Sequence, residues 1–257
     1  MPSPAGTEKI HLPQWGDVYY AEEVTSTNDV AAQMYQQGAP YFTVIWADAQ
    51  MKGRGRLGRK WKTYRDVGLA FSVVVPEGGD VLPLMMSVCL HRAFRRFAAN
   101  HLQQSLTIKW PNDILIGTKK LAGILIESHT DAQGERFYVV GIGLNVQTPP
   151  QGFDETPEAV ALENICHTAP ERSFVLAAIL QELKKILDLQ TENHEDANII
   201  TYYQTHCDTI GQSIIWQDGK NATKGTAKNI TAQGHLILST DTGDITCHVG
   251  EVVVNKD

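Results

Sequence analysis

Short apolar runs separated by turn signals make up most of the chain before about residue 150. The runs with the length and composition of a buried strand are residues 18–24, 42–47, 68–75, 106–110, 113–116, 121–127 and 136–146. Short connections at residues 117–118 and 131–135 predict hairpins, so the strands that they join should run antiparallel. The pattern therefore predicts a mixed, largely antiparallel sheet.

Other segments carry the signals of helices. Ser26 or Thr27 can cap a helix that stops at Gly38, and a second helix covers about residues 80–100. In residues 176–187, apolar side chains recur at the i, i+3, i+4 and i+7 positions of a buried helix face. Because a helix with one apolar face packs on another element, these helices should cover the sheet, and the fold class is α+β.

The pattern changes after about residue 208. Short strands at residues 213–216, 224–230, 235–238 and 244–249 are separated by Asp-Gly, Gln-Gly and Thr-Gly turns. Short strands with such turns fit a small β-barrel. We therefore expect two domains, residues 1–208 with the large sheet and residues 209–257 with the barrel.

Composition excludes some functions without defining one. The formal net charge of the 257 residues is -7 at pH 7, which argues against a general nucleic-acid binder with a basic face. The 4 cysteines are scattered and form no Cys-x-x-Cys pair, so they predict reduced thiols in a cytoplasmic protein rather than a zinc site. The sequence has no apolar signal core and no apolar run of about 18 residues that would span a membrane.

Residues 51–62, MKGRGRLGRKWK, concentrate positive charge within this acidic chain. Glycines alternate with arginines there, so the main chain can approach a ligand closely while planar guanidinium groups bind phosphate or carboxylate. By composition alone, a solvated surface loop or a nucleic-acid-binding tail fits equally well. The predicted strands at residues 42–47 and 68–75 anchor both ends, however, and this position favours a loop that closes over an anion.

Further motifs place polar groups or glycines beside apolar strands, where they are costly without a partner or a purpose. They are residues 25–28 (Thr-Ser-Thr-Asn), Gln50, residues 109–113 (Lys-Trp-Pro-Asn-Asp), residues 119–127 with a glycine inside an apolar strand, and residues 141–145 (Gly-Ile-Gly-Leu-Asn). Ordinary structural roles are also open, because Ser26 or Thr27 suits a helix cap and Asp113 suits a structural hydrogen bond.

In this order, the loop and the motifs resemble the catalytic domain of biotin protein ligase over roughly residues 18–150. The matching residues are Ser26 to Asn28, Gln50, Gly53 to Arg59 with Trp61, Lys109 to Asp113, Lys120 to Glu127, and Gly141 to Asn145. The resemblance implies a class II synthetase-like catalytic domain followed by a small SH3-like barrel. It also implies a ligase that activates biotin with ATP to biotinyl-5′-AMP and transfers biotin to a lysine of a biotin carboxyl carrier protein.

The resemblance assigns roles to individual residues. Arg54 and Lys120 are the predicted catalytic residues, which would neutralise the biotin carboxylate and the α-phosphate. Biotin contacts are expected from Ser26, Thr27, Asn28, Gln50, Gly53, Arg54, Gly55, Arg56, Lys120, Gly123, Gly141 and Gly143. ATP contacts are expected from Arg56, Arg59, Trp61, Lys109, Asn112, Lys120 and Asn145. Asn112 and Asp113 are candidate ligands of the Mg²⁺ that accompanies ATP.

Other functions stay open at this point. Lipoate protein ligase shares the fold class and the adenylate chemistry, although the Gly-Arg-Gly-Arg loop favours biotin. A nucleic-acid-binding module would use the basic loop on phosphates, and a biotin sensor would bind without turnover. Only 25 residues precede Ser26, so we expect the short family form without an N-terminal DNA-binding domain, with no DNA or membrane partner. A monomer and a homodimer are both compatible with the sequence.

Overall fold

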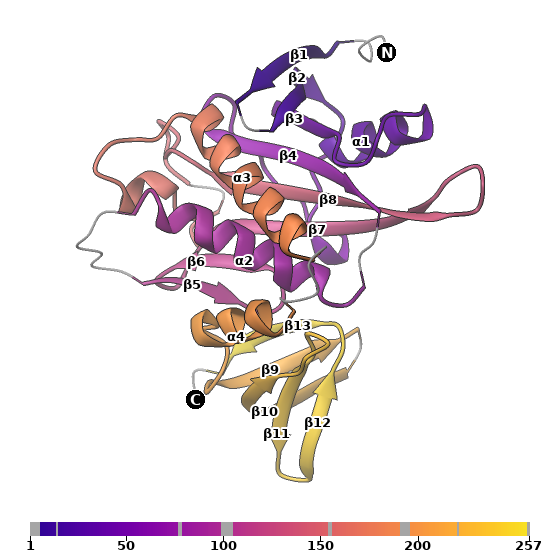
Figure 1. The fold of residues 1–257 in the computed structure, drawn as a ribbon. Coiled ribbons are helices and arrows are strands. Elements are labelled where there is room, and N and C mark those ends of the chain that lie inside the picture. The colour runs from indigo at the N-terminus through magenta and orange to yellow at the C-terminus, as the bar shows by residue number, and fades with distance from the viewer. Residues whose placement is uncertain are drawn as a thin grey trace.

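A computed structural model describes residues 6–13, 15–76, 79–98, 105–153, 156–190, 196–219 and 221–255. Its centre is an 8-stranded sheet with the order β1-β2-β3-β4-β8-β7-β6-β5 (Figure 1). The strands are β1 (Glu8–Leu12), β2 (Gly16–Val24), β3 (Val44–Gln50), β4 (Gly68–Val75), β5 (Leu106–Lys109), β6 (Asp113–Ile116), β7 (Lys119–Thr130) and β8 (Arg136–Asn145). β2 and β3 are parallel and the other neighbours are antiparallel, which confirms the predicted mixed sheet.

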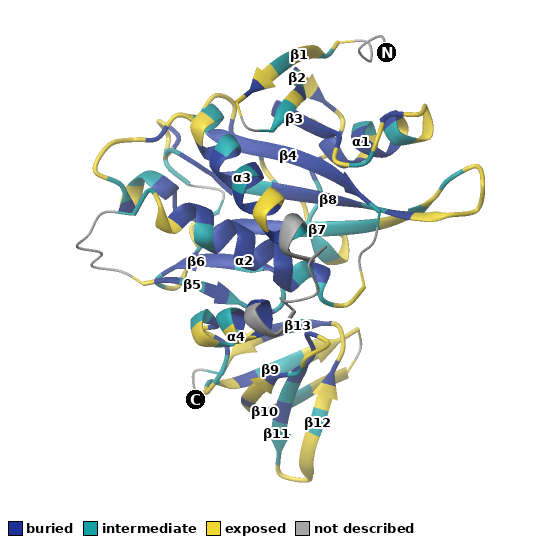
Figure 2. Cartoon of the chain, viewed as in Figure 1, coloured by how far each residue is buried: buried dark blue, intermediate teal, exposed yellow. Residues whose placement is uncertain are grey.

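Helices cover both faces of this sheet. α2 (Leu82–Arg95) and α3 (Arg172–Gln190) pack on one face, and α1 (Thr27–Gln36) packs on the other. β4 shows the reason, because it is buried along its whole length (Figure 2). Its alternate side chains Leu69 and Phe71 join the cluster that contains α2 and α3, whereas Val74 packs with Ala31 of α1.

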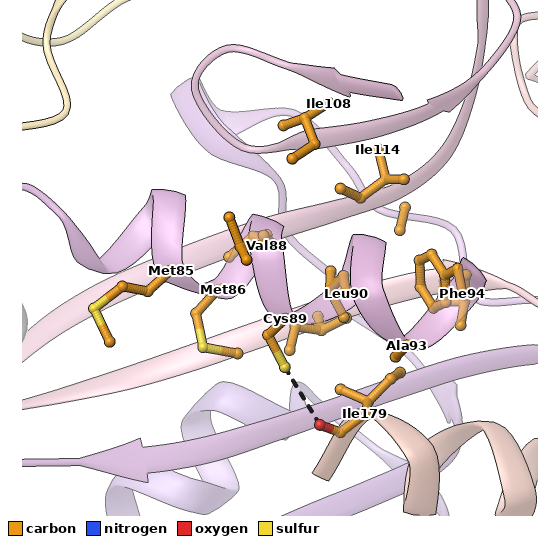
Figure 3. Packing of buried hydrophobic residues seen from close by; sticks show 14 of the residues in the cluster. Met85, Met86, Val88, Cys89, Leu90, Ala93, Phe94, Ile108, Ile114 and Ile179 are labelled. Atoms are coloured by element: carbon orange, nitrogen blue, oxygen red, sulfur yellow. Dashed lines mark hydrogen bonds between the residues drawn. The ribbon is translucent and has the colours of Figure 1, made fainter. Parts of the chain in front are cut away.

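The main core lies between the sheet and the helix pair α2 and α3. Figure 3 shows Val88, Leu90 and Phe94 of α2 packed among buried side chains of the sheet and of α3. The Cys89 thiol donates a hydrogen bond of 3.3 Å to the carbonyl oxygen of Ile179 on α3. The helix face predicted in residues 176–187 faces this core, since Leu176, Ile179, Leu180, Leu183 and Ile186 are buried.

A second, 5-stranded sheet follows, with the order β12-β11-β10-β9-β13. Its strands are β9 (Ser213–Asp218), β10 (Asn221–Ile230), β11 (Leu236–Thr240), β12 (Gly243–Cys247) and β13 (Glu251–Val254). α4 (Asp196–His206) contacts both β5 and β10, so it joins the two sheets (Figure 1). The α+β class with a small C-terminal β unit is therefore confirmed, and in the described ranges we find no helix both long and apolar enough to cross a membrane.

Several elements differ from the expectation. β1, α4 and β13 were not predicted, and α2 ends at Arg95, whereas residues 99–104 lie outside the described ranges. Ser26 occupies the N-cap position of α1 but forms no side-chain capping hydrogen bond. Ser26 therefore stands at the predicted cap position, but its hydroxyl group does not make the capping hydrogen bond.

His91 of α2 is a buried histidine whose charge state should affect stability. It is 1 % exposed, with Nε2 3.0 Å from the carbonyl oxygen of Leu106 and Nδ1 2.9 Å from Tyr202 Oη. Burial lowers the pKa of His91 to about 4, from an ordinary value of 6.5. The folded state therefore binds this proton less readily than the unfolded chain does.

We expect His91 to lower the free energy of unfolding in acid by on the order of 3 kcal/mol. The stabilisation from its neutral form is complete above the unfolded pKa of 6.5 and is lost as the pH falls towards about 4. Urea unfolding of the wild type and of His91→Gln at several pH values measures this. The stability difference between the two proteins should shrink in acid, and a difference that is constant with pH would contradict the prediction.

Candidate ligand-binding site

A cavity of about 120 Å³ lies between the start of α1, the loop of residues 51–62 and the strands β7 and β8. The lining combines residues from segments far apart in the sequence: Ser26, Thr27, Asn28, Gln50, Arg54, Gly55, Arg56, Arg59, Lys60, Trp61, Asn112, Asp113, Lys120, Gly123, Ile124, Leu125, Gly141, Ile142, Gly143 and Glu251. Gly123 and Gly143 are paired across β7 and β8, so neighbouring strands present their glycines to the same region.

One end of the cavity is a network of neutral polar groups. Gln50 Oε1 accepts hydrogen bonds from Thr27 N at 2.9 Å and from Thr27 Oγ1 at 3.2 Å. Ser72 Oγ lies 2.7 Å from Thr27 Oγ1 and 2.6 Å from Asn28 Oδ1. These bonds fix the orientation of the amide and hydroxyl groups. Ser26, whose side chain does not cap α1, adds a hydroxyl group to the same lining.

Arg54 lies beside this network with its charge already compensated. Its two terminal nitrogens donate to Asp29 at 2.6 and 3.0 Å, and Nη2 lies 3.1 Å from both oxygens of Glu127. Glu127 also accepts a 2.6 Å hydrogen bond from Asn28 Nδ2. The hydrogen bond from Arg54 lowers the pKa of Asp29, and the bond to Asp29 raises the pKa of Arg54. Arg54 therefore lines the cavity while its guanidinium group is paired with the carboxylates of Asp29 and Glu127.

The opposite end is cationic, and Arg56 is its most buried arginine. Arg56 Nη1 donates to Asn112 Oδ1 at 3.1 Å, and Nη2 donates to the carbonyl oxygen of Gly250 at 2.8 Å. Both acceptors are neutral, and burial lowers the pKa of Arg56. This guanidinium group therefore keeps a positive charge that an anionic ligand would stabilise.

Further charged pairs surround Arg56. Lys120 Nζ lies 2.7 Å from Asp113 Oδ1, and Arg59 forms an ion pair with Glu251 of β13. The cavity is lined by five cationic side chains and two carboxylates: Arg54, Arg56, Arg59, Lys60 and Lys120 against Asp113 and Glu251. When Asp29 and Glu127, the partners of Arg54, are counted as well, five cationic groups face four carboxylates and one positive charge stays in excess. This excess of positive charge stands within a chain of net charge -7, so the site favours an anion.

The glycines of β8 make room for side chains of the protein itself. A Cβ atom on Gly141 would lie 2.9 Å from Cγ of Asn28, and one on Gly143 would lie 2.6 Å from Cζ2 of Trp61. Trp61 also lies over Gly123 of β7, and Lys120 Nζ lies 5.6 Å from the centroid of its ring. The sequence predicts close approach of a ligand at these glycines, and in this structure the groups that approach Gly141 and Gly143 are Asn28 and Trp61.

We expect Gly143→Ala to weaken ligand binding in the cavity by displacing the Trp61 indole and the loop that carries it. A double-mutant cycle with Trp61→Ala measures the cause, because residues in contact give non-additive effects. Alanine at position 143 should cost little once the indole is absent. Equal losses from Gly143→Ala in the presence and absence of Trp61 would contradict this explanation.

Most predicted site residues are brought together, and three are not. Gly53 packs against the main chain of Trp61, where a Cβ atom would lie 3.4 Å from its carbonyl carbon. Asn145 Nδ2 donates to the carbonyl oxygen of Val160 at 3.3 Å, and Lys109 ends β5 outside the cavity lining. The lining residues that were not predicted are Lys60, Ile124, Leu125, Ile142 and Glu251.

The fold and the site define an α+β protein with a cation-lined cavity for an anionic ligand that also carries neutral hydrogen-bonding groups. Residues 20–146 match the model of the Biotin/lipoate A/B protein ligase family. Residues 20–146 therefore form a domain of the Biotin/lipoate A/B protein ligase family.

Named relatives and solved structures agree with this assignment. The chain is 28% identical over 248 residues to a biotin–[acetyl-CoA-carboxylase] ligase of Mycobacterium tuberculosis, covering 93% of this chain and 89% of the relative. It is 29% identical over 232 residues to the bifunctional ligase/repressor BirA of Bacillus subtilis, covering 87% of this chain and 70% of that protein. Biotin protein ligase from Aquifex aeolicus in complex with biotin and ATP superposes with a TM-score of 0.74 at 25% identity, covering 93% of this chain and 98% of that one.

Proposed function

We propose that this protein is a biotin–[biotin carboxyl carrier protein] ligase. It activates biotin with ATP to biotinyl-5′-AMP and transfers the biotin to a lysine of a carrier protein. One observation carries the proposal: a single cavity joins a neutral hydrogen-bonding end to an end with an excess of positive charge. Biotin has a neutral ureido ring at one end and a carboxylate at the other, so it matches both ends.

At the neutral end, Ser26, Thr27 and Gln50 are assigned to the ureido ring, which both donates and accepts hydrogen bonds. Gln50 is held by Thr27 through Oε1, and its Nε2 donates to Thr63 Oγ1 at 3.2 Å. An amide fixed on both sides presents its remaining hydrogen in one direction, so little entropy is lost when a ring binds. The apolar residues Leu125 and Ile142 in the lining suit the hydrocarbon part of the ligand.

At the cationic end, two anions must meet, because the biotin carboxylate attacks the α-phosphate of ATP and pyrophosphate leaves. Lys120 and Arg56 are assigned to neutralise these groups, and Arg59 and Trp61 are assigned to the nucleotide side. Positioning and electrostatic stabilisation account for catalysis of this kind without a covalent enzyme intermediate.

The geometry favours a different role for Arg54 from the one predicted. Its Nη2 is fully engaged by Asp29 and Glu127 at 2.6 to 3.1 Å, and its charge is compensated by these two carboxylates. We assign Arg54 to holding Glu127 and, through it, Asn28 in place. Arg56 has neutral partners, so we assign to it the neutralising role that the sequence predicted for Arg54.

Magnesium enters this scheme as part of the MgATP substrate. Among the residues that the structure describes, no group of three or more His, Cys, Asp or Glu side chains could hold a metal ion. Asn112 Oδ1 already accepts from Arg56, and Asp113 Oδ1 pairs with Lys120. These two residues do not form a dedicated metal site, so we derive no step through a resident metal.

The carrier protein is assigned to the open edge of β7. β6 pairs with residues 119–123 of β7, and Asn112 then bonds to both the amide nitrogen and the carbonyl oxygen of Ile124. Beyond Ile124, no described strand borders β7 on its outer side. β7 and β8 then extend past the other strands as a long hairpin (Figure 1). An exposed strand edge can pair with an extended segment of another protein. Such pairing would begin at Ile126, two residues after Ile124, which lines the cavity.

The cytoplasm is the compartment that we propose. All 4 cysteines of the chain are free thiols, and such thiols persist where the environment is reducing.

Adenylate formation tests the proposed function and separates biotin from lipoate. The purified protein is incubated with MgATP and either acid, and pyrophosphate release is measured. We expect release with biotin and at least tenfold less with lipoate at equal concentrations, since a single-site preference of that size corresponds to about 1.4 kcal/mol. Preferential release with lipoate would identify the other branch of the family, and binding of biotin without release would identify a sensor.

A further inference from the structure

A second cavity adjoins the ligand-binding site. It has a volume of about 200 Å³ and is lined by Arg56, Asp80, Pro83, Leu84, Trp110, Pro111, Asn112, Ile124, Ile126, Gly234, His248 and Val249. We call it the acceptor slot. Arg56, Asn112 and Ile124 line both cavities, so the slot leads to the cationic end of the first site. Its remaining walls come from the start of α2, the turn between β5 and β6, β7 and the C-terminal β unit.

The walls of the slot are mainly hydrocarbon. Pro83, Leu84, Trp110, Ile124 and Ile126 supply them, and Trp110 is held by a 3.1 Å hydrogen bond from its Nε1 to the carbonyl oxygen of Gly234. That bond fixes the catalytic domain against the C-terminal unit at the slot. An apolar passage of this kind suits an aliphatic chain and is unfavourable for a phosphate group.

Polar groups stand where the slot meets solvent. The side chain of Asp80 is 71% exposed, and its Oδ2 lies 2.9 Å from Nε2 of His235. His248 Nδ1 lies 3.4 Å from the same nitrogen of His235, and the two imidazole rings are 4.1 Å apart. The carboxylate would attract a cation to the mouth, and the imidazole of His248 can accept a proton.

We propose that the acceptor slot admits the side chain of the carrier's target lysine, and that His248 takes up its first proton. The proposal rests on the proposed function. A lysine has the required chemistry, because four methylene groups match the apolar walls and the ammonium group matches Asp80. Arg56 at the inner end repels an ammonium group but tolerates a neutral amine, so the lysine must lose a proton before it reaches the adenylate.

The ε-ammonium group gives one proton to His248 and becomes a neutral amine. The amine nitrogen then forms a bond to the carbonyl carbon of biotinyl-5′-AMP, and the bond from that carbon to the phosphate oxygen breaks. AMP leaves with the electron pair, and the nitrogen releases a second proton to solvent to give the amide.

Filling the slot tests the proposal without changing the first site. Val249 lines the slot and is 62% exposed. Its bond to Trp216 uses the main-chain oxygen, which a substitution retains, so Val249→Trp should fold. Val253→Trp is the matched control, since Val253 is 49% exposed on the neighbouring β13 and lines neither cavity. Single-turnover transfer from preformed adenylate is measured with a carrier domain and with Nα-acetyl-lysine amide.

We expect Val249→Trp to slow transfer to both acceptors at least tenfold and to leave pyrophosphate release within twofold of the wild type, whereas Val253→Trp changes neither. Normal transfer in Val249→Trp would overturn the proposal. So would a loss confined to the carrier domain, which would indicate a docking surface, or an equal loss of pyrophosphate release, which would place the slot in the first step. Absence of adenylate in the wild type would instead overturn the proposed function.

His248→Gln tests the proton acceptor. The groups that face His248 are His235 and, through it, Asp80, with Arg56 in the same cavity. Transfer by His248→Gln should be at least tenfold slower than transfer by the wild type and should recover part of that loss as rising pH lets solvent deprotonate the lysine, so the two pH profiles should differ in slope. Parallel pH profiles would overturn this role, and unchanged pyrophosphate release shows that the first step is intact.

Discussion

Lys120→Ala should reduce adenylate formation by about a hundredfold to a thousandfold, the usual cost of one preorganised group that stabilises transition-state charge. Lys120 Nζ lies 2.7 Å from Asp113 Oδ1 at the cationic end of the cavity. Removing it deletes a positive charge and also leaves the carboxylate of Asp113 unpaired where two further anions must meet. Pyrophosphate release with saturating biotin and MgATP measures the loss.

Lys119→Ala provides the matched control. Lys119 is the preceding residue of β7, is exposed and does not line the cavity, so its loss should leave the rate near that of the wild type. Asp113→Asn combined with Lys120→Ala should recover part of the activity if the unpaired carboxylate contributes to the defect. An unchanged rate in folded Lys120→Ala would reject the role assigned to this lysine.

Arg56→Gly should release biotinyl-5′-AMP at least tenfold faster and so biotinylate lysines of bystander proteins. The guanidinium group bridges Asn112 of the catalytic domain and Gly250 of the C-terminal unit, at 3.1 and 2.8 Å. Its loss removes these bonds and a charge beside the phosphate, and hydrogen bonds from a charged group contribute about 1.5–3 kcal/mol each. Biotin incorporated into an unrelated protein measures the escape.

Arg65→Gly controls for the general effect of exchanging a loop arginine for glycine. Arg65 pairs with Glu23 at 3.1 Å on the surface, away from the cavity lining, so bystander labelling should stay at the wild-type level. Retention of the adenylate by Arg56→Gly for as long as the wild type would show that Arg56 does not hold the ligand.

The large sheet could be predicted because its strands are short apolar runs between clear turns. β4 and β8 were predicted from their sequence almost to the residue. β1 was missed because most of its residues are exposed, Glu8 and Lys9 among them, so the segment carries no strong apolar signal. α4 packs between the two sheets through contacts with β5 and β10, and such tertiary contacts leave little trace in a weakly amphipathic segment.

The site could be located from the sequence, but the partners within it could not. The glycines at 141 and 143 indicated close approach, yet only the structure shows that Asn28 and Trp61 are the approaching groups. Arg54 and Arg56 have the same side chain and lie two positions apart. One pairs with carboxylates and the other with neutral oxygens, and this difference depends on Asp29, Glu127 and Gly250, which the fold brings together.

The contribution of the C-terminal unit also required the structure. Glu251 pairs with Arg59, and the carbonyl oxygen of Gly250 accepts from Arg56, so this unit holds the basic loop from outside the catalytic domain. A carboxylate at the start of a short strand has no sequence pattern that would connect it with a loop almost 200 residues earlier.

Transfer of biotin to a carrier domain tests the central claim most directly. The protein is incubated with biotin, MgATP and a biotin carboxyl carrier domain, and the carrier is analysed by intact mass and peptide mapping. We expect the mass of one biotinyl group on one lysine, dependent on ATP and lost with Lys120→Ala. A carrier that stays unmodified while the wild type is folded and all substrates are present would contradict the account.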